Sequence, residues 1–148
     1  MLYSDEISDI IKHDPRTQKQ FLGVYASNDL PDLYANTFII LNTEPRHKSG
    51  SHWVVLYKNK EHVFEFFDSL GKSPHKYAFK NFPKYKYIVH NLNLIQNPLQ
   101  NTCGYFCLYF SFFKSRGYSI NDIVEHFSSN FYINDLYIKI KIQHLYNI

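Results

Sequence analysis

The sequence predicts an α+β fold, because helix-like segments occur at both ends of the chain and strand-like segments lie between them. Apolar residues recur at helical spacing from residue 4 to about 13 and again from residue 103, whereas short apolar runs occur between residues 21 and 89. We expect the 148 residues to form one domain, residues 1–148, which can bury a core without disulfides or structural metal. No run of about eighteen apolar residues occurs, so no membrane span is predicted.

The first half of the chain contains one predicted helix and four predicted strands. Ile7, Ile10 and Ile11 share a face of the helix, and Asp14-Pro15 ends it, because the residue before a proline avoids the α conformation. The strands are expected at residues 21–25, 37–41, 52–57 and 62–67, with a turn at 28–32 and a polar loop at 42–51. The tight connection at 58–61 makes the last two strands an antiparallel hairpin.

The second half is predicted to be mostly helical. A short lysine-rich helix at residues 73–82, a strand at 85–89 and a loop at 91–102 come first. The next helix ends at Arg116-Gly117, and its apolar face consists of Cys103, Phe106, Cys107, Phe110 and Phe113. Ser119 caps a further helix. In the tail, residues 136, 138, 140 and 142 alternate as in a strand, but Asn134-Asp135 resembles a helix cap, so we expect a helix.

The net charge of +3 is unevenly distributed. No Asp or Glu occurs from residue 69 to 121, where the positive residues are Lys72, Lys76, Lys80, Lys84, Lys86, Lys114 and Arg116. This segment is either a solvated lysine face or a patch for nucleic acid or an acidic partner. Rings at Tyr77, Phe79, Phe82, Tyr85 and Tyr87 could stack on bases, but a core position is the simpler interpretation in a chain with 13 Tyr and 13 Phe.

Cysteine usage and the N-terminus predict an intracellular, reducing location. The two cysteines, Cys103 and Cys107, would neighbour each other on a helix without the geometry of a disulfide. Residues 1–6 are acidic where a signal peptide is basic, so secretion is not expected. A metal site at the cysteines would need two further ligands, and no residue is spaced to supply them, so no metal is predicted. Cys107 is instead expected to be a small core residue.

Four residues at strand ends, at a helix start or in a loop form a candidate catalytic set. Cys103 would begin a helix, where the dipole and the unpaired N–H groups favour a thiolate. His52 begins a strand and suits a general base, and Asp68 ends the neighbouring strand, where it could orient the imidazole. Gln96 precedes Cys103 in a loop, so its side-chain N–H and the backbone N–H of Cys103 would form an oxyanion hole. This combination predicts thiol-based acyl transfer.

Several of these residues also have an ordinary structural explanation. Cys103 could be a buried apolar cysteine, and Asp68 could be a turn residue. Gln100 competes with Gln96 for the oxyanion role, or it could contact substrate or cap the helix. Trp53 either packs over the imidazole or belongs to the core, and Gly104 would allow a close approach of substrate backbone.

In order and spacing, these residues resemble the adenovirus-type cysteine endopeptidases and, more distantly, the proteases that remove small ubiquitin-like modifiers. The matching residues before the candidate nucleophile are Phe21-Leu22-Gly23-Val24-Tyr25, Pro31, Asn42-Thr43 and Gly50-Ser51-His52-Trp53. Those around it are Ile95-Gln96-Asn97-Pro98 and Cys103-Gly104-Tyr105-Phe106-Cys107. The resemblance extends from about Phe21 to Phe113, which is most of the chain.

The resemblance implies a papain-like fold in circularly rearranged order, with a mixed sheet and the cysteine helix packed on it. It implies that His52 is the general base, Asp68 the orienting acid, Gln96 the oxyanion donor and Cys103 the nucleophile. The substrate-binding residues would be Trp53, Gly50, Ser51, Gly104 and Asn97. The family cuts next to glycines and is stimulated by DNA and a short peptide. Three features depart from it: Asp68 stands where adenoviral enzymes carry Glu, the cysteine that links the peptide is absent upstream of Gln96, and the chain is shorter in its C-terminal region.

We therefore expect a cysteine endopeptidase that cleaves viral or virus-like precursor proteins, including capsid proteins, next to glycine. The alternatives are an isopeptidase of ubiquitin-like modifiers and a non-catalytic module that binds nucleic acid or capsid through Lys72, Lys76, Lys80, Lys84 and Lys86. No cofactor is required, and DNA or a peptide is left open as an activator. We expect a monomer with protein substrates and no membrane partner, in the host nucleus or cytoplasm or packaged in the virion.

Overall fold

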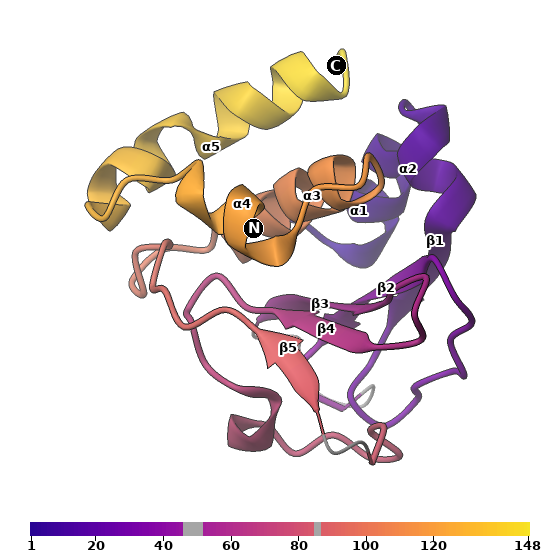
Figure 1. Ribbon diagram of the computed structural model, residues 1–148. Helices are drawn as coiled ribbons and strands as arrows, with labels where there is room; N and C mark the ends of the chain where they lie inside the picture. Colours follow the sequence, from indigo (N-terminus) through magenta and orange to yellow (C-terminus); the bar gives the residue numbers. More distant parts are fainter. Residues whose placement is uncertain (46–51, 85–86) are drawn as a thin grey trace.

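The computed structural model describes residues 1–45, 52–84 and 87–148, and in these residues the strands form one mixed sheet with helices on one face (Figure 1). The strands lie in sequence order: β1 (Phe21–Tyr25), β2 (Thr37–Asn42), β3 (Trp53–Lys58), β4 (Phe64–Phe67) and β5 (Ile88–His90). The outer pairs, β1 with β2 and β4 with β5, are parallel, whereas β3 is antiparallel to both neighbours. The predicted α+β class and the β3–β4 hairpin are confirmed.

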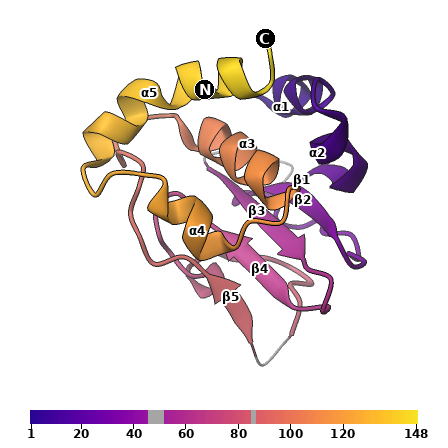
Figure 2. The same cartoon turned by 45° about the horizontal axis from the view of Figure 1, so that its top comes forward.

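The helices are α1 (Ser4–Ile11), α2 (Pro15–Gln20), α3 (Cys103–Lys114), α4 (Ile120–Glu125) and α5 (Phe131–Leu145), with a 3₁₀ turn η1 (Pro74–Lys76). The central helix α3 packs directly on β3, and α5 packs against the outer side of α3 (Figure 2). Of the helices in the described residues, none is both long and apolar enough to cross a membrane.

The core has two parts because the strands are buried on both faces. Successive side chains of β2 point to opposite faces, as the two-residue period of a strand requires. Phe38 and Ile40 face the helices, whereas Ile39 and Leu41 belong to a second cluster on the far face. This alternation continues in β3 and β4. The sheet therefore needs a covering layer on the face without helices.

Residues 77–82 belong to that covering layer, so the predicted lysine-rich helix at residues 73–82 is wrong. Only η1 is helical there, and the chain after it is irregular. The ring centroids of Phe79 and Phe82 lie 6.0 and 6.2 Å from that of Phe66 in β4. Burying these rings against the sheet outweighs the weak helical preference of so short a segment.

The N-terminal region contains a helix that the sequence did not predict. Asp14 follows the end of the first helix as expected, but it also caps α2, since its side chain accepts a hydrogen bond from the Thr17 N–H at 3.2 Å. Pro15 occupies the first turn of α2, where its missing N–H is not needed.

The C-terminal tail is helical, as expected, but its cap lies earlier than predicted. Asn130 caps α5 by accepting from the Tyr132 N–H at 3.1 Å, and Asn134 and Asp135 lie inside the helix. The strand expected at residues 85–89 corresponds to β5, which begins at Ile88. Residues 85 and 86 lie outside the described residues.

Candidate active site

Cys103 is the first residue of α3, and its thiol faces the start of β3. The Sγ atom accepts a hydrogen bond from the backbone N–H of Trp53 at 3.4 Å, and the residue is buried. The preceding residue, Thr102, does not cap the helix with its side chain. Since the first N–H groups of a helix have no partner within it, this position favours a negative charge on the sulfur.

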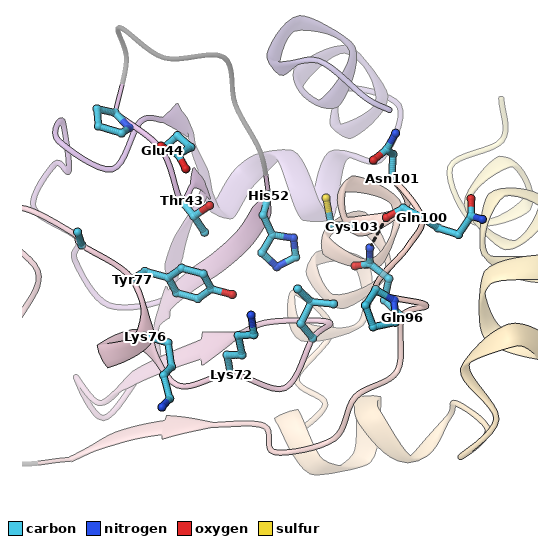
Figure 3. Close-up of a pocket in the computed structure, with 14 residues that line it drawn as sticks. Thr43, Glu44, His52, Lys72, Lys76, Tyr77, Gln96, Gln100, Asn101 and Cys103 are labelled. Atoms are coloured by element: carbon cyan, nitrogen blue, oxygen red, sulfur yellow. Dashed lines mark hydrogen bonds between the residues drawn. The ribbon is translucent and has the colours of Figure 1, made fainter.

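His52 immediately precedes β3, and Asp68 immediately follows β4, the antiparallel neighbour of β3. The Nε2 atom of His52 lies 2.6 Å from Oδ1 of Asp68. Both side chains are buried, and Asp68 has no exposed surface. Because Asp68 occupies Nε2, Nδ1 is the ring nitrogen available to Cys103, and Figure 3 shows the imidazole beside the cysteine.

The electrostatics of this pair favour a protonated imidazole. Burial opposes protonation of His52, but the hydrogen bond to Asp68 and the interactions with Cys103 outweigh it and raise the pKa of His52 to about 9. A charged imidazolium next to a thiol favours the thiolate, which is the nucleophilic form. The imidazole is therefore placed where its positive charge faces the thiol of Cys103.

Asp68 is fixed by residues that the sequence analysis did not assign to the site. Its Oδ2 accepts from the Tyr77 hydroxyl at 2.5 Å, and its Oδ1 also accepts from the Leu70 N–H at 2.9 Å. The Asn91 side chain accepts from the Asp68 N–H at 3.0 Å and donates to the Asp68 carbonyl at 2.6 Å. Burial and the bond to Asp68 raise the pKa of Tyr77 far above its usual value, so this hydroxyl remains a donor.

The Gln96 amide is held in one orientation beside Cys103. Its Oε1 accepts from the Ser69 hydroxyl at 2.5 Å, and its Nε2 donates to the Gln100 carbonyl at 2.9 Å. An amide nitrogen carries two hydrogens, so one N–H remains for another acceptor. The Gln100 side chain points away from Cys103 (Figure 3), so the geometry favours Gln96 over Gln100 as a donor at the thiol.

These groups meet in a pocket of about 530 Å³. Its lining residues are Thr43, Glu44, Pro45, His52, Leu70, Lys72, Lys76, Tyr77, Ala78, Gln96, Pro98, Gln100, Asn101 and Cys103. The candidate nucleophile, base and oxyanion donor thus share one cavity, and Asp68 lies behind His52. Such a set can attack a carbonyl carbon and stabilise the resulting oxyanion.

Three of the substrate-binding residues expected from the resemblance make contacts away from the pocket. The Trp53 side chain is in the core, where its Nε1 donates to the Leu2 carbonyl at 2.9 Å. A Cβ atom on Gly104 would lie 3.2 Å from the Cβ atom of Leu2, so this glycine makes room for Leu2. Asn97 supports its own turn by accepting from the Leu99 N–H at 3.0 Å. None of the three lines the pocket, and the expected Gly50 and Ser51 lie outside the described residues.

Only some of the described positive residues between positions 69 and 121 are exposed and outside ion pairs. Lys72 and Lys76 line the pocket, with the ammonium of Lys72 pointing into it and that of Lys76 pointing away (Figure 3). Lys80 and Lys84 are exposed elsewhere, and Lys86 lies outside the described residues. By contrast, Lys114 and Arg116 form ion pairs with Glu65 at 2.7 Å and Asp14 at 2.8 Å. Phe79 and Phe82 pack on the sheet, so they are not free to stack on bases.

Cys107 lies one turn into α3 and has no exposed surface, as expected for a core residue. Both cysteines are free, and burial raises the pKa of the Cys107 thiol well above its usual value. Among the described residues, no group of three or more His, Cys, Asp or Glu side chains could hold a metal ion. Because Cys107 is a buried free thiol in the same helix, its rate of alkylation can be compared with that of Cys103 in the same protein.

The fold and the pocket together define an α+β domain with a thiol, an imidazole and a carboxylate in one connected site. No protein-family model matches the chain. The "Protease" of Bovine adenovirus 4 is 29% identical to it over 101 residues, covering 56% of this chain and 50% of that protein. The chain thus spans about half the length of the relative that it matches. This similarity agrees with the adenoviral resemblance of the sequence.

Proposed function

We propose that the chain is a cysteine protease with a papain-like fold of the adenovirus type. The observation that carries this proposal is the His52–Asp68 pair, joined at 2.6 Å, in a pocket that also holds Cys103 at a helix start. A binding module has no need for a buried imidazole–carboxylate pair next to a thiol, because burying such groups is costly. The similarity to a viral protease supports the same class of reaction.

In the proposed reaction, Cys103 gives its proton to His52, and the thiolate Sγ attacks the carbonyl carbon of a peptide bond. His52 then transfers this proton to the leaving amine as the C–N bond breaks, which leaves a thioester on Cys103. A water molecule attacks the thioester while His52 accepts its proton. The acid product leaves, and the thiol is restored. Asp68 keeps the imidazole in the orientation that both steps require.

The proposed substrates are viral or virus-like precursor proteins that are cut next to glycine. The support for this finer proposal is the adenoviral resemblance of the residues and the named viral relative. Cleavage of peptides, compared with cleavage of modifier conjugates, separates an endopeptidase from an isopeptidase. DNA remains a proposed activator, through the exposed Lys72, Lys76, Lys80 and Lys84.

The proposal is tested by alkylation of the chain with iodoacetamide across a range of pH. Labelling is expected at Cys103 from about pH 6.5, because a His52 pKa of about 9 preserves the imidazolium that favours the thiolate. His52→Ala should slow labelling at this pH by at least about tenfold, as an isolated thiol is mostly protonated there. The buried Cys107 should stay unlabelled, and mass spectrometry of the digested protein locates the modification.

Labelling that is slow below about pH 8 and unaffected by His52→Ala would contradict the proposal for the chain alone. The same measurement with DNA then separates the remaining cases. Rapid labelling only with DNA would identify a protease that needs an activator, whereas slow labelling in both conditions would favour a binding module.

Replacement of Gln96 tests the proposed oxyanion hole. Gln96→Ala removes one donor to the oxyanion, so kcat for peptide hydrolysis should fall by about 10²–10³ with little change in KM. Gln100→Ala is the matched control, because its carbonyl remains and its side chain points away from Cys103. Steady-state kinetics of both variants check this. Equal losses in the two variants would contradict the assignment of Gln96.

A further inference from the structure

Two neighbouring polar residues of α5, Asn134 and Asp135, contact the loop that leads to Cys103. Asn134 Nδ2 donates to the Ile95 carbonyl at 3.0 Å. The Asp135 carboxylate accepts from two donors, with Oδ2 bound to the Asn97 N–H and Oδ1 bound to the Thr102 hydroxyl. The C-terminal helix therefore holds this loop by hydrogen bonds along its length, although these residues lie far away in the sequence.

The two donors that Asp135 binds are next to the two residues that matter most for the proposed oxyanion hole. Asn97 directly follows Gln96, and Thr102 directly precedes Cys103. One carboxylate thus joins the two ends of the segment that separates the amide donor from the nucleophile. Inside the segment, the Gln100 N–H donates to the Asn97 carbonyl at 3.0 Å, so the inner turn is built on a residue that Asp135 holds.

The contact with Thr102 also affects the start of α3. A threonine that precedes a helix often caps the first N–H groups with its hydroxyl. Here the hydroxyl donates to Asp135, and the Thr102 side chain makes no capping hydrogen bond. The contact therefore directs this hydroxyl away from the helix end, where the backbone N–H of Cys103 is the second proposed oxyanion donor.

We propose that Asp135 is a positioning residue for the oxyanion hole, which it controls through the Asn97 N–H and the Thr102 hydroxyl. This inference rests on the proposed protease function. Asp135 does not line the pocket and does not contact the imidazole, so its effect should be confined to the step in which an oxyanion forms. A misplacement of about 1 Å in such a site costs about 10² in rate.

The test compares two reactions of the same thiol in Asp135→Asn. This variant keeps the shape of the side chain but removes its charge and leaves one acceptor oxygen instead of two, so it can accept from Asn97 or from Thr102 but not from both as the carboxylate does. Peptide hydrolysis should fall by about 10–10² in kcat with KM changed less than about threefold. Alkylation of Cys103 by iodoacetamide forms no oxyanion at a carbonyl, so its rate should stay within about twofold of wild type.

Two further variants and one control variant complete the test. Thr102→Val removes only one of the two bonds and should show a smaller loss with the same separation between hydrolysis and alkylation. The double variant Asp135→Asn/Gln96→Ala should lose less than the two single losses combined, because the changes share the Gln96 donor and only the effect on the Cys103 N–H remains. Asp122→Asn, an exposed carboxylate on α4, is the matched control and should keep the wild-type kinetics.

The outcomes distinguish this role from the proposed function. An active wild type with an Asp135→Asn variant of equal kcat would overturn the role of Asp135 alone. Parallel loss of hydrolysis, alkylation and thermal stability would also overturn it, because it would show a general structural effect. A wild type that neither labels at Cys103 nor hydrolyses peptides, with or without DNA, would overturn the proposed function and this role with it.

Discussion

Replacement of Cys103 by serine is expected to lower peptide hydrolysis by about 10⁴-fold or more. A serine hydroxyl is far less acidic than a thiol, so the His52 imidazole can no longer share an ion pair with its neighbour before substrate binds. The fold should be kept, since the two side chains have similar shapes and the surrounding core is unchanged. Steady-state hydrolysis by purified wild type and variant measures the loss.

Cys107→Ala is the matched control for this prediction. Cys107 lies in the same helix, has no exposed surface and faces the core, so the variant should keep its kcat. Removing one buried sulfur should instead reduce the free energy of unfolding by about 1–2 kcal/mol. Hydrolysis that survives Cys103→Ser but not Cys107→Ala would contradict the assignment of the nucleophile.

Replacement of Asp68 by asparagine is expected to lower kcat by about 10³–10⁴-fold. Asp68 accepts from His52 Nε2 at 2.6 Å, and this contact helps to raise the pKa of His52 to about 9. A neutral amide cannot stabilise the imidazolium in the same way and does not fix its tautomer. The pH profile of alkylation at Cys103 should therefore move to higher pH in the variant. An unchanged profile would contradict the role of Asp68.

The same variant should change how the stability of the fold depends on pH. The folded-state pKa of His52, about 9, lies above its ordinary value of 6.5, so the protonated imidazole stabilises the fold. This contribution is complete below about pH 6.5 and is lost as the pH rises to about 9. The difference in Tm between wild type and Asp68→Asn should therefore shrink across this interval. A constant difference would show that Asp68 stabilises the fold by other contacts alone.

Much of the candidate site could be predicted from the sequence because its main residues lie at the ends of strongly patterned elements. Cys103 starts a helix whose apolar spacing is clear, and His52 and Asp68 flank the two strands of a hairpin. Antiparallel pairing then brings His52 and Asp68 together without any distant contact. Their 2.6 Å contact follows from local structure and register.

Residues 73–82 and the supporting contacts could not be predicted in this way. Tyr77 reaches Asp68 only because its segment covers the far face of the sheet and does not form the predicted helix. Asn91 reaches Asp68 because β5 is parallel to β4, a pairing between segments separated by an irregular region. Neither a local spacing nor a composition specifies such a contact.

The sequence by itself determined the order of the strands along the chain, the helices that begin at Ser4, Cys103 and Ile120, and the chemical identity of the candidate site. These features depend on periodicity, caps and residue types over short stretches of chain. The tertiary structure alone decided which side chains hold the site in place, among them Tyr77, Asn91, Ser69 and Asp135. Their contacts depend on how the far layer, the parallel strand and the C-terminal helix pack, and packing is set by the burial of the whole core rather than by any one segment.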